Sequence, residues 1–355
     1  MGVLTELNER EELVQHRQVS NILVTSISQK IPMLREIRNA AHKMGRSFKI
    51  FGGDSNREAL GRFFVDEFWH MPLISQISAS AIIEYCQNKQ INALIPTRDG
   101  ELLFFAENKG DLEKAGIHVM ISPRDSIRTC LDKVIFSEVL QELGYPVIPT
   151  YIRHGDLKSD CLAVKERFGA GSKSIGLCLT SEAAQYHAKL LKEPIFQPFI
   201  NGREYSVDVY VDKLGKIKGA VARERVVVVN GESQVTTTVL LPALEDMCGK
   251  VAQKLKFYGH IIFQVIIDND GSFHIIECNP RFGGASSLSI AAGLDSFYWF
   301  LLECGEENLS SYPFIRSAEE LTQVRYPDDM IIRCSNLPPN ILDMLHMGKI
   351  RTDIV

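Results

Sequence analysis

Residues 261–287 read IIFQVIIDNDGSFHIIECNPRFGGASS, and this stretch decides the fold of the second half of the chain. An apolar run is followed by an Asp/Asn/Gly turn and by a second apolar run, so we predict a β-hairpin. Alternation along the strands places Gln264 on one face, and Glu277 and Asn279 on a shared face. If the strands pair in the simplest way, these three oxygen-bearing side chains converge near the open end of the hairpin.

The three side chains are candidate ligands of a metal ion. Oxygen ligands suit Mg²⁺, which keeps several of its waters and bridges to phosphate groups. The alternative is that Glu277 and Asn279 only terminate a strand, because Asn-Pro commonly breaks one. The spacing alone leaves both interpretations open.

Composition bounds the class of protein. A chain of 355 residues with 45% hydrophobic and 23% charged residues is typical of a globular protein with two or three domains. Its formal net charge of −5 gives no electrostatic basis for a nucleic-acid partner. The eight cysteines include no C-x-x-C pair, which predicts reduced, mostly buried thiols in a cytosolic protein.

Targeting signals are not found in the sequence. The first 18 residues are polar and acidic and lack the apolar core of a signal peptide, and Glu6 breaks the myristoylation pattern. No apolar run approaches the length needed to span a bilayer. We therefore expect a soluble, cytoplasmic protein without a membrane partner, and a short helical or frayed extension at residues 1–18.

The first third of the chain alternates predicted strands and helices. Strands are expected at 21–25, 48–54 and 93–96, with helices from about 33 to 45 and from 78 to 90. This order predicts an open parallel sheet with right-handed crossovers. No G-x-G-x-x-G follows the first strand, so a dinucleotide site is not expected. Polar residues that either line a ligand site or cap helices follow the strand ends at Ser26, Lys30, Asp54, Arg98, Asp99 and Glu101.

A Gly/Ser/Lys-rich loop lies in the middle of the chain. A long helix at roughly 125–143 carries Lys133, a strand at 162–167 ends near Lys165, and the loop FGAGSKSIG follows at 168–176. Its backbone N–H groups and flanking cations are what a polyphosphate requires. It is not a P-loop, because it lacks the G-x-x-x-x-G-K-[ST] pattern. The alternative is a flexible turn without a ligand.

Further elements are expected towards the C-terminus. They are strands at 194–200, 205–212 and 217–222, helices at 244–255 and 291–302, and an irregular segment from 305 to 355 with a strand near 330–333.

Four motifs in order resemble the ATP-grasp superfamily, and most closely its carbamoyl-phosphate-synthase-like branch of carboxylate–amine ligases. They are Lys133, VKERFGAGSKSIG (164–176), QPFINGREYSVDV (197–209) and the hairpin FQ…IECNPRFGGASS. The resemblance implies an α/β fold, with α+β character in the ATP-grasp part. A Rossmann-like parallel-sheet domain would precede a two-subdomain ATP-grasp fold. The expected parts are 1–18 (extension), 19–123 (Rossmann-like), 124–196 (lid subdomain) and 197–355 (C-terminal subdomain).

The resemblance also implies a role for individual residues. Lys133 and Lys165 would hold the α- and β-phosphates of ATP, Glu204 the ribose hydroxyls, and Arg281 would face the transferring γ-phosphoryl group. Mg²⁺, with Mn²⁺ as a possible substitute, would bind Gln264, Glu277 and Asn279. The lid over the phosphates would include Gly169, Gly171, Ser172, Lys173 and Ile175, and the adenine would meet Gln197, Pro198, Phe199 and Ile200.

The implied reaction is an ATP- and Mg²⁺-dependent ligation. A substrate carboxylate attacks the γ-phosphate, and an amine then displaces phosphate from the acyl phosphate to form an amide or peptide bond. Arg223 and Arg225 are candidate carboxylate anchors, because guanidinium binds carboxylate bidentately; the alternative for both is a solvated strand edge. Gly284, Ser286 and Ser287 are further candidates for the substrate pocket.

Two other functions remain open at this point. Bicarbonate would replace the carboxylate in a carbamoyl-phosphate-synthase-like reaction, and a nucleotide-binding regulator would have lost catalysis. Small carboxylates and amines, including amino acids, are the expected partners of the ligase. A homodimer is expected only from the resemblance.

Overall fold

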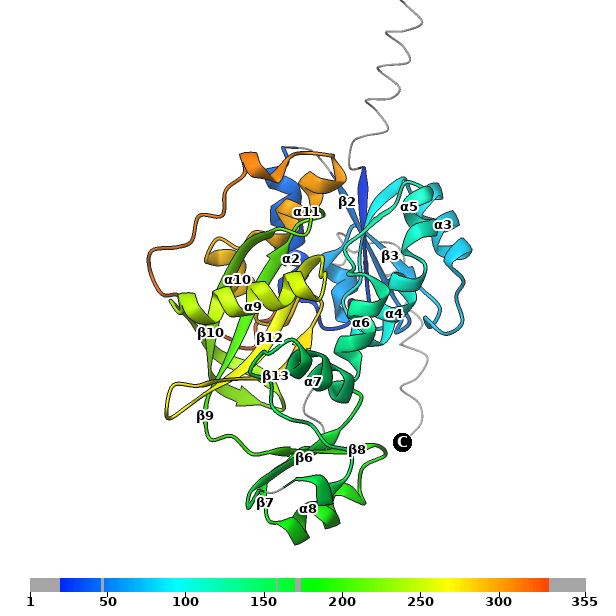
Figure 1. Cartoon of the computed structure of the whole chain (residues 1–355). Coiled ribbons are helices and arrows are strands. Elements are labelled where there is room, and N and C mark those ends of the chain that lie inside the picture. The colour runs from blue at the N-terminus through cyan, green and yellow to red at the C-terminus, as the bar shows by residue number, and fades with distance from the viewer. Residues whose placement is uncertain (1–19, 46–47, 158, 170–173, 332–355) are drawn as a thin grey trace, which may run out of the picture. The chain divides into compact units, whose positions relative to one another are not determined.

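The computed structural model describes residues 20–331 except 46–47, 158 and 170–173. Its first sheet has five parallel strands in the order β3-β2-β1-β4-β5 (Figure 1), which confirms the predicted open parallel sheet. The strand β3 was not predicted, because its four residues lie at the sheet edge and none is fully buried. The strands are β1 (Asn21–Thr25), β2 (Lys49–Asp54), β3 (Glu67–His70), β4 (Ile91–Ile95) and β5 (His118–Val119).

Helices cover both faces of this sheet. Alternate residues of β1 enter different cores, so that Ile22 and Val24 pack on the side of α2 and Leu23 on the side of α3, α4 and α5. The apolar stripe predicted from spacing, which includes Leu34 and Ile37, is buried in α2. The helices are α2 (Ile31–Lys43), α3 (Ala79–Asn88), α4 (Asp99–Glu107) and α5 (Lys109–Lys114), with a 3₁₀ turn, η1, at Leu60–Phe64.

The predicted helix 125–143 is two helices, α6 (Arg124–Leu131) and α7 (Lys133–Glu142). Asp132 interrupts them in an extended conformation, and its carboxylate accepts hydrogen bonds from Val134 N and Ile135 N. Asp132 is the N-cap of α7, so the prediction of one continuous helix was wrong at this residue. The break places Lys133 at the first turn of α7.

A three-stranded antiparallel sheet of order β7-β6-β8 follows, and α8 covers one of its faces (Figure 1). Its small core joins Leu162 and Val164 to Ala184 and Phe196. The elements are β6 (Leu162–Glu166), β7 (Gly176–Leu179), α8 (Ser181–Ala188) and β8 (Pro194–Pro198), with a 3₁₀ turn, η2, at His154–Asp156.

The largest sheet has six strands in the order β13-β12-β9-β10-β11-β14. The predicted hairpin is confirmed, since β12 and β13 pair antiparallel. The strand β11 was not predicted, because its sequence ESQVTTTV contains no apolar run. The strand expected at 330–333 is not found at residues 330 and 331, and β14 lies earlier in the chain. Of that predicted strand, residues 332 and 333 lie outside the described residues. The strands are β9 (Gly202–Val211), β10 (Ile217–Val229), β11 (Glu232–Val239), β12 (Gly259–Asp268), β13 (Phe273–Asn279) and β14 (Thr322–Val324).

Helices pack on both faces of the six-stranded sheet. On one face, α9 (Pro242–Lys254) and α7 share a core with Val207, Val209 and Phe263. On the other lie α10 (Ser287–Ala291) and α11 (Ser296–Cys304), with η3 (Leu309–Ser311) beyond. The single helix predicted at 291–302 was wrong, because Gly293, with φ +103°, separates α10 from α11.

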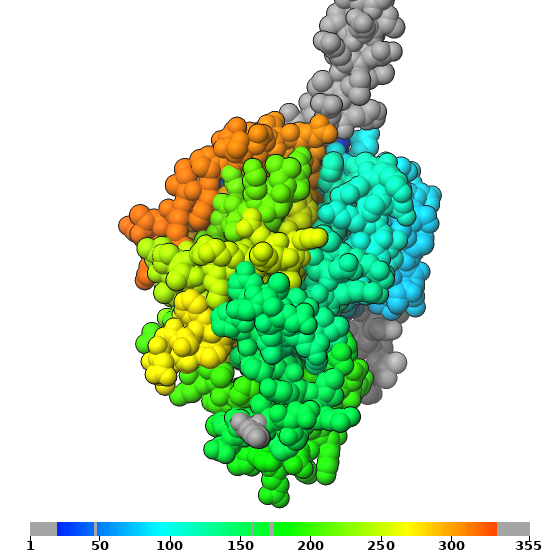
Figure 2. Space-filling model, viewed as in Figure 1, coloured from blue at the N-terminus to red at the C-terminus, as the bar shows by residue number. Residues whose placement is uncertain are grey.

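The parallel sheet and the six-stranded sheet share one core. Side chains of α2 and α11 belong to the same buried cluster. Ser122 Oγ donates to Tyr258 O at 3.1 Å and Ser126 Oγ to Leu255 O at 2.6 Å, and the segments that carry them touch at the surface (Figure 2). The described residues up to Gln323 therefore form one compact unit.

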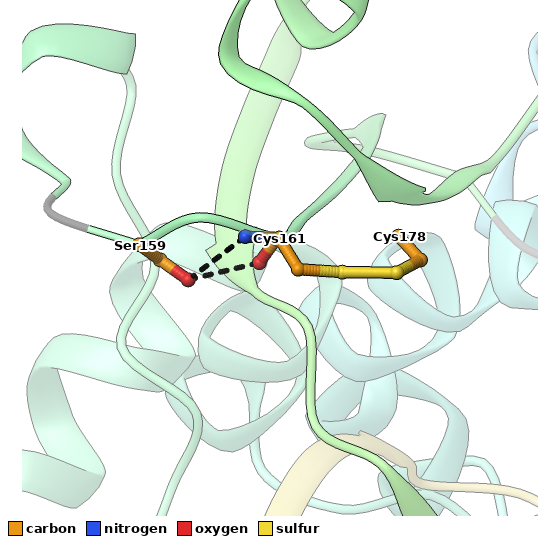
Figure 3. The surroundings of a disulfide bond; sticks show 3 residues. All are labelled: Ser159, Cys161 and Cys178. Atoms are coloured by element: carbon orange, nitrogen blue, oxygen red, sulfur yellow. Dashed lines mark hydrogen bonds between the residues drawn. A yellow bond between two sulfur atoms is a disulfide. The ribbon is translucent and has the colours of Figure 1, made fainter.

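One pair of cysteines corrects the expectation of reduced thiols. Cys161, before β6, and Cys178, in β7, form a disulfide beside Ser159, whose hydroxyl donates to Cys161 O (Figure 3). The two residues are brought together by the β6–β7 pairing, which cysteine spacing cannot reveal. Cys86, Cys130, Cys248, Cys278 and Cys304 are free, four of them buried, and Cys334 lies outside the described residues. None of the described helices is both long and apolar enough to cross a membrane.

A buried polar network lies beneath α10. Asp208 Oδ1 accepts hydrogen bonds from His260 Nε2 at 2.8 Å and Ser286 Oγ at 2.5 Å. Its Oδ2 accepts from Arg223 Nε at 2.5 Å and Ser289 Oγ at 2.7 Å. Burial opposes ionisation, but the Arg223 charge and the hydrogen bonds hold the pKa of Asp208 well below its usual range. The carboxylate is thus an ionised centre that fixes β9, β10, β12 and α10 together.

We expect Asp208→Ala to lower the free energy of unfolding by about 3–5 kcal/mol, because it leaves the Arg223 charge buried and unpaired. Urea unfolding followed by circular dichroism measures this change. Asp111→Ala, which removes an exposed carboxylate paired only with Lys114, is the matched control and should change stability little. Equal effects of the two substitutions would contradict the role of the network.

Candidate functional site: a cavity between the two antiparallel sheets

A cavity of about 620 Å³ lies between the three-stranded and the six-stranded sheet. Its walls include residues of α7, β6, β7, β8, β9, β10, β12 and β13, so residues up to 144 positions apart, Lys133 and Glu277, meet there. The cavity brings together twelve of the residues predicted from the sequence: Lys133, Lys165, Gly169, Ile175, Gln197, Pro198, Phe199, Ile200, Glu204, Arg225, Gln264 and Glu277. Gly171, Ser172 and Lys173 lie outside the described residues.

Lys165 is the central cation of the cavity. Its side chain leaves β6 towards the six-stranded sheet, and the residue is only 9% exposed. Burial lowers the pKa of Lys165 to about 8, although the nearby carboxylates of Glu277 and Glu204 act in the opposite direction. The charged ammonium of Lys165 therefore destabilises the free protein. An anion that enters the cavity would stabilise the charged form.

Lys133 is held at the edge of the same cavity by the start of the Gly/Ser/Lys-rich loop. Its Nζ donates to Gly169 O at 2.9 Å and to Arg167 O at 3.3 Å. Arg167 in turn forms a bidentate pair with Asp132, at 2.8 and 2.5 Å. Burial opposes ionisation of Asp132, yet the hydrogen bonds from Arg167 and the α7 backbone lower its pKa. The break between α6 and α7 thus positions both Lys133 and the loop.

The segment from Gln197 to Ile200 forms a flat, mostly apolar wall. Gln197 is buried, and its Nε2 donates to Thr150 Oγ1 at 2.7 Å, which orients its carbonyl oxygen. Phe199 N already donates to Cys161 O at 2.9 Å. The amide of Phe199 is therefore not available to a ligand, although the residue lines the cavity. A planar ligand would form hydrogen bonds with backbone groups of the neighbouring residues.

Glu204 and Arg225 close the cavity on the side of β9 and β10. Arg225 Nε lies 3.2 Å from Glu204 Oε1, and Arg225 Nη2 donates to Gly231 O at 2.9 Å. Burial raises the pKa of Glu204, while the Arg225 charge opposes this shift. Arg225 is therefore a wall of the cavity and not a solvated strand edge.

The candidate metal ligands lie on adjacent strands. Gln264 pairs with Glu277 in the β12–β13 register, and both line the cavity. Asn279 Nδ2 donates to Glu277 Oε1 at 3.3 Å, so Asn279 adjoins the pair although it is not part of the wall. No group of three or more His, Cys, Asp or Glu residues suitable for a metal occurs in the described part of the chain. With one carboxylate, this set suits a cation that also takes oxygen ligands from its substrate.

Arg281 contacts the parallel-sheet part and is not among the residues that line the described cavity. Its Nε and Nη2 donate to the two carboxylate oxygens of Asp99, both at 2.6 Å. Burial would lower its pKa, but Asp99 and then Glu277 raise it. Arg281 thus joins the end of the hairpin motif to the carboxyl edge of the parallel sheet.

The remaining substrate candidates lie away from the cavity wall. Arg223, which is 2% exposed, and Ser286 both donate hydrogen bonds to Asp208. Ser287 Oγ donates to Gln323 Oε1 at 3.3 Å, and Gly284 is exposed. None of these four is among the residues that line the described cavity.

Several wall residues escaped sequence reasoning because they are apolar. Ile266 shares its strand face with Gln264, two positions away. Val228 lies three positions from Arg225 and reaches the same cavity because β-bulges between them interrupt the alternation. The strand period of two could have identified Ile266 as a wall residue. The other unpredicted wall residues are Ile148, Ala163, Glu166, Phe168, Leu177, Asn201, Gly202, Gly231 and Ile276.

Two family models match the chain and together cover more than half of it. One, described as ATP-grasp in the biosynthetic pathway with Ter operon, matches residues 191–326, and the other, described as the PylC-like N-terminal domain, matches residues 22–120. The match to the first model identifies residues 191–326 as an ATP-grasp domain. The motifs that carried the sequence resemblance are those that form the cavity.

Relatives of this ATP-grasp chain include the large chain of carbamoyl phosphate synthase from Pyrococcus furiosus. It is 23% identical over 206 residues, which cover 51% of this chain and 20% of that protein. The chain spans about a fifth of the length of the curated relatives it matches.

Solved structures confirm the fold. The biotin carboxylase domain of Hydrogenobacter thermophilus 2-oxoglutarate carboxylase, in complex with MgADP, ADP and bicarbonate, superposes with a TM-score of 0.71 at 18% identity. That match covers 86% of this chain and 74% of the other. An L-amino acid ligase from Bacillus licheniformis gives a TM-score of 0.61 at 18% identity, covering 83% and 76%.

We expect Lys165→Met to stabilise the ligand-free protein at pH 7 by up to about 3 kcal/mol, because each unit of lowered pKa costs about 1.4 kcal/mol. The pKa of Lys165 falls from about 10.5 unfolded to about 8 folded. Between pH 8 and 10.5 the unfolded chain therefore binds more protons than the folded protein. The loss of unfolding free energy that the buried ammonium causes in wild type is fully present below pH 8 and disappears as the pH rises to 10.5. Urea unfolding at pH 7, 9 and 10.5 measures the difference between the two proteins.

The exposed residue Lys114 provides the control, since Lys114→Met should give a small difference that does not vary with pH. A Lys165→Met advantage that stayed constant from pH 7 to 10.5, or a loss of stability at pH 7, would contradict the buried ammonium.

Proposed function

We propose that the protein is an ATP- and Mg²⁺-dependent ligase that joins a carboxylate to an amine through an acyl phosphate, with release of ADP and phosphate. One observation carries the proposal: Lys133, Lys165, Glu204, Gln264 and Glu277, from separate parts of the sequence, line a single cavity. Its volume of about 620 Å³ is in the range of small-molecule and cofactor sites.

The cavity offers each part of ATP a matching surface. Lys165 and Lys133 supply cations for the phosphates, with the loop that begins at Gly169 above them. The wall from Gln197 to Ile200 would take the adenine, and Glu204 would accept hydrogen bonds from the ribose hydroxyls. Entry of the phosphates would compensate the partly desolvated ammonium of Lys165.

The residues present fit Mg²⁺. Gln264, Glu277 and Asn279 offer oxygen atoms with a single negative charge, so they would hold the ion together with oxygen ligands from phosphate and water. Bound there, the ion would neutralise charge on the phosphate oxygens. Arg281, 2.6 Å from Asp99 and adjacent to Glu277, would act on the γ-phosphoryl group from the other side.

In the proposed reaction the substrate supplies the nucleophile. A carboxylate oxygen bonds to the γ-phosphorus as the bond to the β-phosphate oxygen breaks, which leaves ADP. The amine then bonds to the acyl carbon, the C–O bond to phosphate breaks, and the amine loses its proton. The role of the protein is to position the reactants and to stabilise charge, the main requirement of phosphoryl transfer.

A second candidate is carboxylation chemistry with bicarbonate. The carbamoyl phosphate synthase relatives and the biotin carboxylase domain with bound bicarbonate favour it. The similarity to an L-amino acid ligase favours the carboxylate–amine reaction. A catalytically silent ATP-binding regulator is the third candidate, and a homodimer remains a prediction.

A matrix of small carboxylates and amines, incubated with ATP and Mg²⁺ and followed by ADP release, tests the function. We expect release that requires one carboxylate and one amine together, with a mass-spectrometric signal for the amide. Release driven by bicarbonate alone would favour the second candidate. Calorimetric ATP binding without turnover on any pair would favour the regulator.

We expect Glu277→Gln to reduce Mg²⁺-dependent turnover by at least about 100-fold, because it removes the only carboxylate of the proposed metal site. ADP release measured over a range of Mg²⁺ concentrations should show the loss. Glu84→Gln, an exposed change in α3, serves as the control and should behave as wild type. Normal activity of Glu277→Gln would rule out the metal assignment.

A further inference from the structure

The disulfide of the three-stranded sheet adjoins the cavity of the proposed ATP site. It joins Cys161, which directly precedes β6, to Cys178 in β7, with 4.8 Å between their Cα atoms (Figure 3). Residues of both strands line the cavity, and they include Lys165 on β6 and Leu177 on β7. The cross-link therefore acts on the pair of strands that forms one wall of the proposed site.

The strand β7 is weakly attached to its sheet. It is the edge strand in the order β7-β6-β8, and its pairs with β6, Leu162 with Leu179 and Val164 with Gly176, are separated by a shift in register. The central strand β6, in contrast, pairs with β8 at five consecutive positions. Gly176 is the only buried residue of the four in β7. With so little pairing and burial, β7 depends on the disulfide to stay in place.

The two cysteines are held differently. Cys161 is half-buried, and its carbonyl oxygen accepts hydrogen bonds from Phe199 N and from Ser159 Oγ, both at 2.9 Å. Cys178 is exposed and has φ +50°, a left-handed conformation that residues other than glycine rarely adopt. Such a conformation persists only where its surroundings fix it. Because Cys161 is anchored beside Phe199, cleavage of the disulfide would release β7 and leave β6 in the sheet.

Cys178 is also the sulfur that a reductant can reach. Four of the five free cysteines in the described part of the chain are buried, whereas Cys178 is exposed. Exposed disulfides exchange readily with external thiols, because attack requires access to one sulfur. The position of the bond therefore favours exchange at this pair over reaction at the buried thiols.

The exchange is a balanced two-electron step with a dithiol as the reductant. One thiolate of the dithiol attacks Cys178 Sγ, which forms a mixed disulfide and releases Cys161 as a thiolate that takes up a proton. The second thiolate of the dithiol then attacks its own sulfur in the mixed disulfide. This closes the disulfide of the dithiol and releases the Cys178 thiolate, so two electrons pass to the protein.

We propose that the Cys161–Cys178 disulfide is an exchange site for dithiols, and that its oxidation state sets the affinity of the protein for ATP. In the oxidised protein β7 is fixed, so Ile175 and Leu177 are already placed in the cavity wall. In the reduced protein ATP has to order these residues as it binds, and this cost lowers the affinity. The inference rests on the proposed ATP site.

Calorimetric titration with ATP and Mg²⁺, before and after treatment with dithiothreitol, tests the proposal. We expect reduction to raise the Kd for ATP about 5- to 20-fold, and reoxidation with glutathione disulfide to restore it. Mass spectrometry after alkylation should find Cys161 and Cys178 linked before reduction and alkylated after it. Cys178→Ser should bind ATP as weakly as reduced wild type in both conditions. Cys130→Ser, which changes a free, half-buried cysteine of α6, should respond as wild type does.

Two results would overturn the proposal: the same Kd for ATP in oxidised and reduced wild type, or alkylation of both cysteines in protein treated with glutathione disulfide. Failure of the proposed ATP site has a different signature, since ATP would then bind in neither state although the disulfide forms. The effect on ATP affinity would be overturned with it, and hydrogen exchange of the β7 amides would decide the remaining part. Faster exchange after reduction supports control of β7 by the disulfide, and unchanged exchange overturns it.

Discussion

The antiparallel register of β9, β12 and β13 is the constraint on which the rest of the site depends. Because side chains alternate with a period of two, Val207 and Phe263 point into the core under α9 while Ser206, Gln264 and Glu204 point to the opposite face. A slip by one residue would bury the carboxylates and expose the core, so burial itself selects the register. The burial of apolar side chains that fixes the strand register therefore also places the polar side chains together on the opposite face.

Buried charges near that face differ in how fully their neighbours compensate them. Asp208, on β9, is paired with Arg223, His260 and serine hydroxyls, and it contributes to the fold. Lys165, which reaches the cavity from β6 of the three-stranded sheet, is buried but incompletely compensated, and burial lowers its pKa. The first arrangement stabilises the free protein, whereas the second costs stability until an anion arrives. This contrast separates the structural charges of the sheet from those suited to a ligand.

The two halves of the chain meet through Arg281. Its bidentate pair with Asp99 connects the last residues of the hairpin motif to the carboxyl edge of the parallel sheet, where loops are positioned by Glu101. The shared core of α2 and α11 keeps this junction fixed. The hairpin motif and the carboxyl edge of the parallel sheet are consequently neighbours, although about 180 residues of sequence separate Asp99 from Arg281.

Sequence alone determined the elements with strong periodicity and the ATP-grasp motifs, because hydrophobic alternation, turn residues and spacing are local properties. It thereby identified Lys133, Lys165, Glu204, Gln264 and Glu277, which the structure brings into one cavity. Only the tertiary structure decided that Arg223 and Ser286 serve the Asp208 network, that Asp132 divides a helix to hold Arg167, that Cys161 meets Cys178, and that Arg281 pairs with Asp99. Each of these depends on which distant groups share a buried space, and the free energy of a charge or hydrogen bond is set by those neighbours and not by its place in the chain.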